Sequence, residues 1–351
     1  MTRSGPASEL VLATIEADGP LRFDRYVELC LYGEDVGFFA TGGGAGRQGR
    51  DFVTSPEVGP LFGRLLATAI DRWWEHLGRP HPFAVVEAGA GRGTLARTIL
   101  AAEPSCGPAL DLVLVETSSS LRAEHPDGVR SLAELPDQVG IGLVLANELL
   151  DNLPPRVAVR TQDGWSELHV GVEGDALVEV LVPPVEPVPA LDAPVGARVP
   201  VQTAAASWVV RALDLVDAGA VIAIDYTSAT AELAVRPWTD WLRTYAGHRR
   251  GGPPLDVPGA QDITCDVCID QLPTPTAVTS QADHLRLLGL DALVDEGRQI
   301  WAERAHLGDL QAMVARSRIA ESDALVDPTG LGAFSVMEWV ASGDRPPTMR
   351  P

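Results

Sequence analysis

The chain has 351 residues, 46% of them hydrophobic, so it can bury one large core or two coupled ones. Its formal net charge is −21, and every cationic residue among its 27 is an arginine. Phosphate binding usually needs a basic face, so this charge disfavours a nucleic-acid partner. The lack of lysine excludes Schiff-base chemistry and a phosphate-binding loop that ends in lysine.

The sequence predicts a cytoplasmic protein with no membrane insertion. Residues 1–12 lack the basic start and long apolar run of a secretory signal. No run reaches the roughly 18 apolar residues that a membrane helix needs. Because the cytoplasm is reducing, we expect the cysteines of a cytoplasmic protein to be reduced. Cys265 and Cys268 form a C-x-x-C pair, but no second Cys or His pair stands at ligand spacing, and no metal site is predicted.

Residues 1–80 predict an N-terminal helical region with a lid. Apolar residues at helical spacing cover 10–17 and 23–31, and one further helix is expected from Pro56 to Trp74. Thr54 or Ser55 would cap that helix. The glycine-rich residues 42–50 cannot form a regular element. We expect this loop and Thr54–Glu57 to close over a ligand.

Strands and helices alternate over residues 81–351, which predicts the core of the protein. This alternation is typical of an α/β fold of the Rossmann type, with a doubly wound, mostly parallel sheet. Two insertions are expected, one after strand four at about 156–200 and one after strand five at 230–262. The first should contain antiparallel strands that turn at Gly164 and Gly174. The expected strands are 83–88, 112–116, 142–146, 221–225 and 333–340, and the expected helices are 94–102, 280–288 and 296–320.

A glycine-rich turn follows the first of these strands, in the order Glu87-Ala88-Gly89-Ala90-Gly91-Arg92-Gly93-Thr94. The dinucleotide fingerprint G-x-G-x-x-G/A would need Gly or Ala where Thr94 stands. Glu87 suits the cationic amino-acid end of S-adenosylmethionine, which nicotinamide cofactors lack. Glu116 ends the second strand, where an acidic residue binds a ribose hydroxyl pair in this architecture. These features predict an S-adenosylmethionine site.

Polar residues also follow the strand at 142–146, in the order Asn147-Glu148-Leu149-Leu150-Asp151-Asn152. Residues at the carboxyl end of a parallel strand lie in the ligand crevice. We therefore expect Asn147 to contact the cofactor and Glu148 and Asp151 to contact the methyl acceptor. The alternative is that Asn147 caps a short helix and that both acids are simply exposed.

Together these motifs resemble the MidA-like family of S-adenosylmethionine-dependent methyltransferases, from about Arg22 to Trp339. Eukaryotic members are complex I assembly factors that methylate arginine on a complex I subunit. The chain departs from the family at Thr227, where a glycine is usual, and at Cys265-Asp266, where Ala-His is expected. The resemblance is carried by residues 51–57, 62–63, 87–95, 116–122, 146–154, 242–248 and 258–264.

The resemblance implies a class I methyltransferase fold, S-adenosylmethionine as the cofactor and a protein arginine as the acceptor. Carboxylates suit a guanidinium, so Glu148 and Asp151 would orient it and His248 would accept or relay a proton. The expected substrate-side residues are Asp225, Tyr226, Arg243, Tyr245 and Asp262. The expected cofactor-binding residues are Thr54, Ser55, Pro56, Glu57, Glu87, Gly89, Gly91, Gly93, Glu116, Thr117 and Asn147.

Two other functions stay open at this point. The first is a methyltransferase for a small molecule, which an enclosed apolar acceptor pocket would favour over an open acidic groove. The second is an assembly factor that binds the cofactor and a partner protein, by resemblance a respiratory complex subunit, but transfers nothing. Trp73-Trp74 and residues 334–339 could pack internally or form a homodimer interface.

Overall fold

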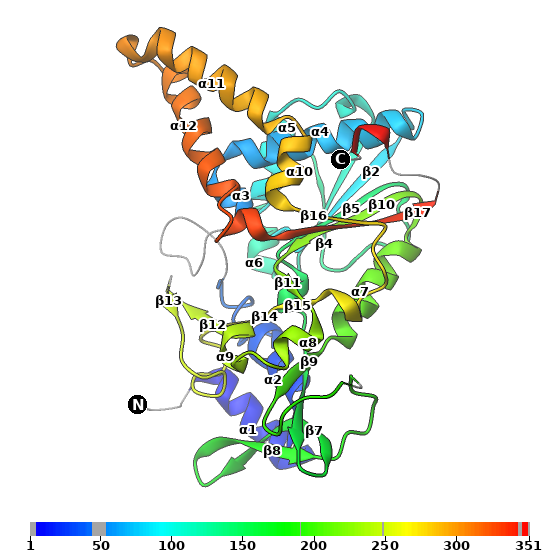
Figure 1. Cartoon of the computed structure of the whole chain (residues 1–351), viewed down its shortest axis with the longest axis vertical. Coiled ribbons are helices and arrows are strands. Elements are labelled where there is room, and N and C mark those ends of the chain that lie inside the picture. The colour runs from blue at the N-terminus through cyan, green and yellow to red at the C-terminus, as the bar shows by residue number, and fades with distance from the viewer. Residues whose placement is uncertain (1–4, 44–53, 190, 248, 343–345, 350–351) are drawn as a thin grey trace.

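The structure is a computed structural model, and it describes residues 5–43, 54–189, 191–247, 249–342 and 346–349. Its centre is a seven-stranded sheet in the order β16-β17-β10-β5-β2-β3-β4 (Figure 1). Five neighbouring strands are parallel, β17 is antiparallel to β10, and β16 is antiparallel to β17. The strands are β2 (Phe83–Ala88), β3 (Leu110–Val115), β4 (Arg130–Leu132), β5 (Gly140–Asn147), β10 (Val216–Asp225), β16 (Ala277–Ser280) and β17 (Ser335–Ser342). The predicted doubly wound α/β fold is confirmed.

Helices cover both faces of this sheet. Val85 and Leu143 point to one face, where they join a core cluster with α4 (Pro60–His76) and α5 (Thr94–Ala101). Val86 and Val144 point to the other face, where they pack against α7 (Thr203–Asp214). Because both faces are buried, these strands appear in the sequence as continuous apolar runs.

The helix predicted from Pro56 to Trp74 is two helices, so that prediction was wrong. A short α3 (Ser55–Val58) ends at Gly59, and α4 begins directly after it. A Cβ on Gly59 would lie 2.2 Å from Cδ of Glu321. The Glu321 carboxylate accepts the Leu61 amide at 2.9 Å, so it satisfies a free donor at the start of α4.

The insertion after β5 forms a second, antiparallel sheet with the N-terminal segment. Gly164 and Gly174 lie at its turns as predicted. The helices α1 (Pro6–Asp18) and α2 (Phe23–Tyr32) share a core cluster with this sheet. The division of the chain at residue 80 stays a prediction. The strands of this sheet are β1 (Leu21–Arg22), β6 (Arg156–Thr161), β7 (Gly164–Glu173), β8 (Ala176–Val182) and β9 (Arg198–Val201).

The segment after β10 is also structured. It forms a three-stranded sheet in the order β13-β12-β14 and a two-stranded pair of β11 with β15. Cys265 ends β14 and Cys268 ends β15, and both are buried free thiols whose pKa burial raises. The elements are β11 (Thr227–Ser228), α8 (Thr230–Leu233), α9 (Trp238–Trp241), β12 (Leu242–Ala246), β13 (Arg249–Arg250), β14 (Asp262–Cys265) and β15 (Val267–Cys268).

A helical arm projects from the body (Figure 1). After α10 (Gln281–Leu287), the arm consists of α11 (Leu290–Arg304) and α12 (Leu310–Leu325), so the single helix predicted at 296–320 was wrong. The chain reverses at Gly308, which has a φ of 59°, and the Asp309 side chain caps α12 by accepting the Ala312 amide at 2.9 Å.

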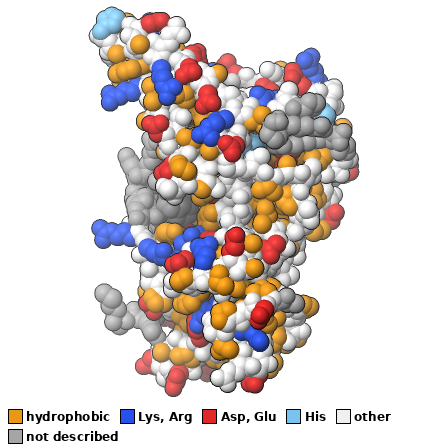
Figure 2. Space-filling view, viewed as in Figure 1, with side chains coloured by type: hydrophobic (Ala, Val, Ile, Leu, Met, Phe, Trp, Pro, Cys, Tyr) orange, Lys and Arg blue, Asp and Glu red, His pale blue; other side chains and the backbone are white. Residues whose placement is uncertain are grey.

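On the face shown in Figure 2, acidic and basic side chains are interspersed. Within the described ranges, no helix combines the length and apolar character that crossing a bilayer would require.

Candidate active site

A cavity of about 790 Å³ lies at the carboxyl ends of β2, β3 and β5. This is the edge where doubly wound sheets bind ligands. Its lining brings together three groups of residues that are far apart in the sequence: the turn after β2 with the end of β3, the segment 147–154 after β5, and one side of α2.

The turn after β2 has left-handed backbone at three glycines. The φ angles are 68° at Gly89, 54° at Gly91 and 75° at Gly93, a region that glycine enters without steric cost. Gly89 and Gly91 line the cavity, and a Cβ on Gly91 would meet nothing within 4 Å. Gly93 lies outside the lining, immediately before α5, and a Cβ there would lie 2.9 Å from Cδ of Pro126. The backbone of this turn is therefore open to a ligand.

Two carboxyl groups flank this turn. Glu116 is bound to it, because Oε2 accepts the Gly91 amide at 3.0 Å, while Oε1 accepts the Ser118 amide at 2.8 Å. Glu87 is only 6% exposed, and burial raises its pKa to about 8. Its Oε2 has no hydrogen-bond partner among the described residues, although the side chain lines the cavity. An orphaned buried carboxyl beside an open glycine turn fits the ammonium group of S-adenosylmethionine.

The segment Thr54–Glu57 borders the same cavity. Thr54, Pro56 and Glu57 line it, and Oε1 of Glu57 accepts the Thr94 hydroxyl at 2.7 Å. Ser55 lies outside the lining, and its hydroxyl donates to Gln281 at 2.9 Å. These contacts fix α3 against α5 and α10. Residues 44–53, which include most of the predicted lid, lie outside the described residues.

Glu148 has a strained backbone at the end of β5. Its φ is 52°, a left-handed conformation that costs a non-glycine residue about 1 kcal/mol or more. Its Oε1 accepts the Asn147 amide group at 3.1 Å and the Ser55 backbone amide at 3.3 Å. Burial, and then the charge of Asp151, raise the pKa of Glu148 to about 8. Both Asn147 and Glu148 line the cavity, as does Thr117 beside Glu116.

Asp151 and Asp225 lie close together, outside the cavity lining. Oδ2 of Asp225 accepts the amides of Leu150 at 3.0 Å and Asp151 at 3.2 Å, and so fixes the short helix η2 (Leu150–Asn152). The Tyr226 hydroxyl donates to Oδ2 of Asp151, whose Oδ1 has no hydrogen-bond partner in the described part of the chain. Burial raises the pKa of Asp151 to about 6. Asp225 and Tyr226 therefore support the segment that lines the cavity.

The other expected substrate-side residues also lie outside the lining. The Arg243 guanidinium is 4.5 Å from the Tyr226 ring centre and donates to Asp266 at 2.7 Å. Asp262 is buried, accepts from the Asn152 side chain at 2.9 Å, and pairs with Tyr245 across β14 and β12. Asp266, one of the departures from the family pattern, thus holds an arginine. His248 lies outside the described residues.

The α2 side of the cavity was missed by the sequence analysis. Tyr32 lines the cavity and its hydroxyl donates to the Asn152 carbonyl at 3.2 Å. Arg25 and Glu28 line it too, at helical spacing from Tyr32. The sequence shows that these residues share one helix face. A polar helix face is usually exposed to solvent, so the sequence did not predict that they line a cavity. The other unpredicted lining side chains include Arg22, Asp24, Phe39, Trp208 and Arg211.

The strand order, the glycine turn, the acidic residue after β3 and the polar segment after β5 define a class I S-adenosylmethionine-dependent methyltransferase. The chain belongs to the family of S-adenosyl-L-methionine-dependent methyltransferases, whose model matches residues 65–289. The resemblance predicted from the motifs is thereby confirmed.

Relatives and solved structures agree with this assignment. The mouse mitochondrial protein arginine methyltransferase NDUFAF7 is 26% identical over 90% of this chain and 82% of its own length. The Drosophila melanogaster homologue is 27% identical over 75% and 68%. A Burkholderia thailandensis protein bound to S-adenosyl-homocysteine is 28% identical, with a TM-score of 0.81 over 96% of this chain and 92% of that one.

Proposed function

We propose that this methyltransferase modifies arginine side chains of a partner protein. The cavity is acidic, which favours a cationic acceptor, and a guanidinium stays charged at every physiological pH. The names of the mouse and fly relatives support the same acceptor. Glu87 and Glu148, whose pKa burial raises to about 8, would ionise when a cation pairs with them. The lining holds seven acidic residues, Asp24, Glu28, Glu57, Glu87, Glu116, Glu134 and Glu148, against four arginines, Arg22, Arg25, Arg92 and Arg211.

The turn after β2 is the proposed cofactor half of the cavity. Glu87 would pair with the ammonium group and Glu116 with the ribose hydroxyls, since Oε2 of Glu116 has a second lone pair beyond its contact with the Gly91 amide. The Gly89–Gly91 backbone allows close approach. When bound there, S-adenosylmethionine supplies an electrophilic methyl group on a sulfonium ion. Thr54, Pro56 and Glu57 would cover it on the α3 side.

Glu148 carries the proposal for the acceptor half. Its Oε1 is held by Ser55 and Asn147, so the carboxyl group has a fixed position at the edge of the cavity. A guanidinium beside it would stabilise the ionised form and orient one nitrogen towards the methyl group. The methylated guanidinium must then lose a proton. Glu148, once ionised by the guanidinium beside it, is a suitable acceptor for that proton.

The partner and its location are part of the same proposal. The relatives are named as mitochondrial proteins. For this chain we keep the cytoplasmic location expected from its sequence, with a protein partner and no nucleic acid. A homodimer stays a prediction.

The acceptor can be tested with methyl-labelled S-adenosylmethionine and a peptide library in which each arginine peptide has a citrulline counterpart. Citrulline keeps the shape of arginine but has no charge. We expect label only in methylarginine of the arginine peptides.

Glu148→Gln should lower kcat by about 100-fold, the usual contribution of a general base, with unchanged affinity for S-adenosylhomocysteine. Glu75→Gln, exposed on α4 and outside the cavity, is the control.

Label in citrulline peptides as well, or only in small molecules of a cell extract, would contradict an arginine acceptor. The second outcome would favour the small-molecule methyltransferase. Tight binding of the cofactor without transfer to any acceptor would favour an assembly factor that transfers nothing.

A further inference from the structure

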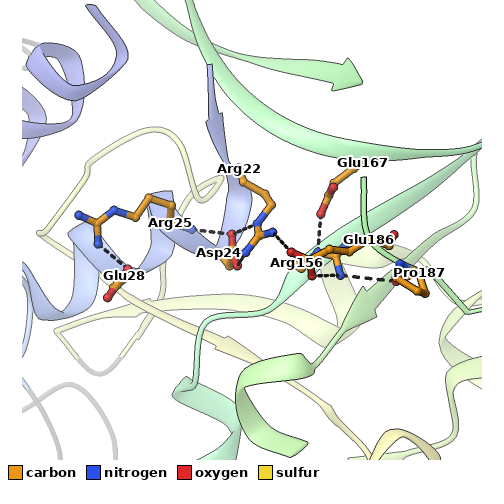
Figure 3. A network of polar contacts seen from close by, with 8 residues as sticks. All are labelled: Arg22, Asp24, Arg25, Glu28, Arg156, Glu167, Glu186 and Pro187. Carbon is orange, nitrogen blue, oxygen red and sulfur yellow. Dashed lines mark hydrogen bonds and ion pairs between the residues drawn. The ribbon is translucent and has the colours of Figure 1, made fainter. Parts of the chain in front are cut away.

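One wall of the cavity is formed by four charged residues, Arg22 at the end of β1 and Asp24, Arg25 and Glu28 on α2. We call this set the α2 wall (Figure 3). The charges alternate in sign, so the wall could in principle hold a cation or an anion. What the wall can bind depends on which of these side chains are held in buried ion pairs and which can exchange their partner for a ligand.

Arg22 and Asp24 are fixed in a network. Arg22 donates to Asp24 at 2.6 Å and to Glu186 at 2.8 Å. Glu186 also accepts from Arg156 at 3.1 Å, and Arg156 forms an ion pair with Glu167 in which both side chains are 3% exposed. Removing one partner of such a buried pair is costly, so the network anchors Arg22 and Asp24 firmly (Figure 3).

Arg25 and Glu28 form a separate pair that is easier to open. Their guanidinium and carboxylate are 2.5 Å apart, and the side chains are 51% and 52% exposed. Figure 3 shows that Arg25 contacts the Arg22–Glu186 network through its backbone amide, which donates to Asp24 at 2.8 Å, whereas its guanidinium contacts Glu28. An exposed pair three residues apart on a helix contributes little to stability. Another charged group can therefore replace either partner at small cost.

The pair lines the same cavity as Glu148, the residue of the proposed acceptor half. Glu28 and Tyr32 stand four residues apart on α2, which corresponds to about 6 Å along the helix axis. The Tyr32 hydroxyl contacts the Asn152 carbonyl, on the segment that begins with Asn147 and Glu148. A peptide bound along this cavity with one residue at Glu148 would bring a second residue to Glu28.

We propose that Glu28 binds a second cationic side chain of the acceptor segment, next to the arginine that is methylated. Arg25 holds Glu28 in the free protein and gives it up when the acceptor cation arrives. The substrate class is therefore a segment with two nearby basic residues. This inference rests on the proposed arginine methylation and adds a specificity-determining residue to it.

The opposite signs of the two charges allow a sharp test. Glycine-rich peptides with one arginine, or with two arginines separated by one to four glycines, would be titrated into protein saturated with S-adenosylhomocysteine. For wild type, we expect the best two-arginine spacing to bind about fivefold more tightly than the single arginine, the upper range for an exposed ion pair. Glu28→Gln should abolish this gain, and Arg25→Gln should increase it.

The arm offers a matched control. Asp295 and Arg298 on α11 form an ion pair of the same i,i+3 type, 71% and 61% exposed, and neither residue lines the cavity. Asp295→Asn and Arg298→Gln should leave every peptide affinity within about twofold of wild type. A purely structural role for Arg25 and Glu28 would make their variants behave like these controls.

The outcomes separate the two proposals. Transfer of label to arginine with equal affinity for one- and two-arginine peptides, or shifts of the same sign in Glu28→Gln and Arg25→Gln, would overturn the role of Glu28 and leave arginine methylation standing. Failure of wild type to bind or methylate any arginine peptide would overturn the proposed function, and the role of Glu28 with it.

Discussion

The Tyr226 hydroxyl donates a hydrogen bond to the Asp151 carboxylate and so joins the end of β10 to the segment that follows β5. Asp225 reinforces the junction by accepting the amides of Leu150 and Asp151. The Arg243 guanidinium lies over the Tyr226 ring. Residues expected on the substrate side thus set the position of the residues that line the cavity.

Tyr226→Phe should change the pH dependence of methyl transfer more than the stability of the protein. The hydroxyl stabilises ionised Asp151, so its loss should raise the Asp151 pKa further above about 6. If ionised Asp151 supports the reaction, the acidic limb of the kcat profile moves to higher pH, with KM little changed. A pH–rate profile from pH 5 to 9 measures this shift. An unmoved acidic limb would show that Asp151 has only a packing role.

Glu87→Gln should alter how stability depends on pH. The folded protein keeps the Glu87 proton up to pH about 8, whereas an unfolded chain releases it near pH 4.5. Between these values the folded state binds more protons than the unfolded state. The contribution of protonated Glu87 to the stability of the folded state is therefore fully present below pH 4.5 and is lost as the pH rises towards 8. Between pH 4.5 and 8, the free energy of unfolding of wild type should therefore fall, relative to that of the variant, by on the order of 1 kcal/mol per pH unit.

Urea denaturation of both proteins at pH 5, 6, 7 and 8 tests this difference, with Glu75→Gln on the exposed part of α4 as the control. Glu75→Gln should follow wild type at every pH. Parallel curves for wild type and Glu87→Gln would mean that Glu87 is ionised in the free protein.

Gly63→Ala should destabilise the packing of α4 on α5. A Cβ at this position would lie 1.9 Å from Oγ1 of Thr98, so one helix has to move. Overpacking of this kind costs about 1–3 kcal/mol in the free energy of unfolding. The double variant Gly63→Ala/Thr98→Ala should recover part of the loss, because it removes the atom in the way. A single variant as stable as wild type would contradict the close contact.

The parts of the site that the sequence predicted are local in the chain. Glu87, Gly89 and Gly91 belong to one strand–turn–helix unit, while Asn147 ends a buried strand and Glu148 directly follows it. In a parallel sheet such segments end at the same edge, so their meeting follows from the fold class. The strands themselves were readable because helices bury both of their faces.

What the sequence did not predict depends on long-range contacts. Tyr32 reaches Asn152 across 120 positions of the chain, and no periodicity of α2 indicates that contact. Arg243 and Asp262 carry chemically suitable groups, but the structure holds them in contacts with Asp266 and Asn152. The break before α12 was missed because the apolar pattern continues past Gly308, while the cap at Asp309 is a local polar signal.

The most direct test is whether the cavity beside Glu116 binds the cofactor. Purified protein would be titrated calorimetrically with S-adenosylmethionine, S-adenosylhomocysteine and NAD, and the titrations repeated with Glu116→Ala and with Glu75→Ala as the control. We expect both sulfur nucleosides to bind wild type and the control, NAD to bind neither, and Glu116→Ala to bind at least about tenfold more weakly, since it loses charge-assisted hydrogen bonds. Equal affinity in Glu116→Ala, or no binding of either nucleoside to folded wild type, would contradict the assignment of this cavity as the cofactor site.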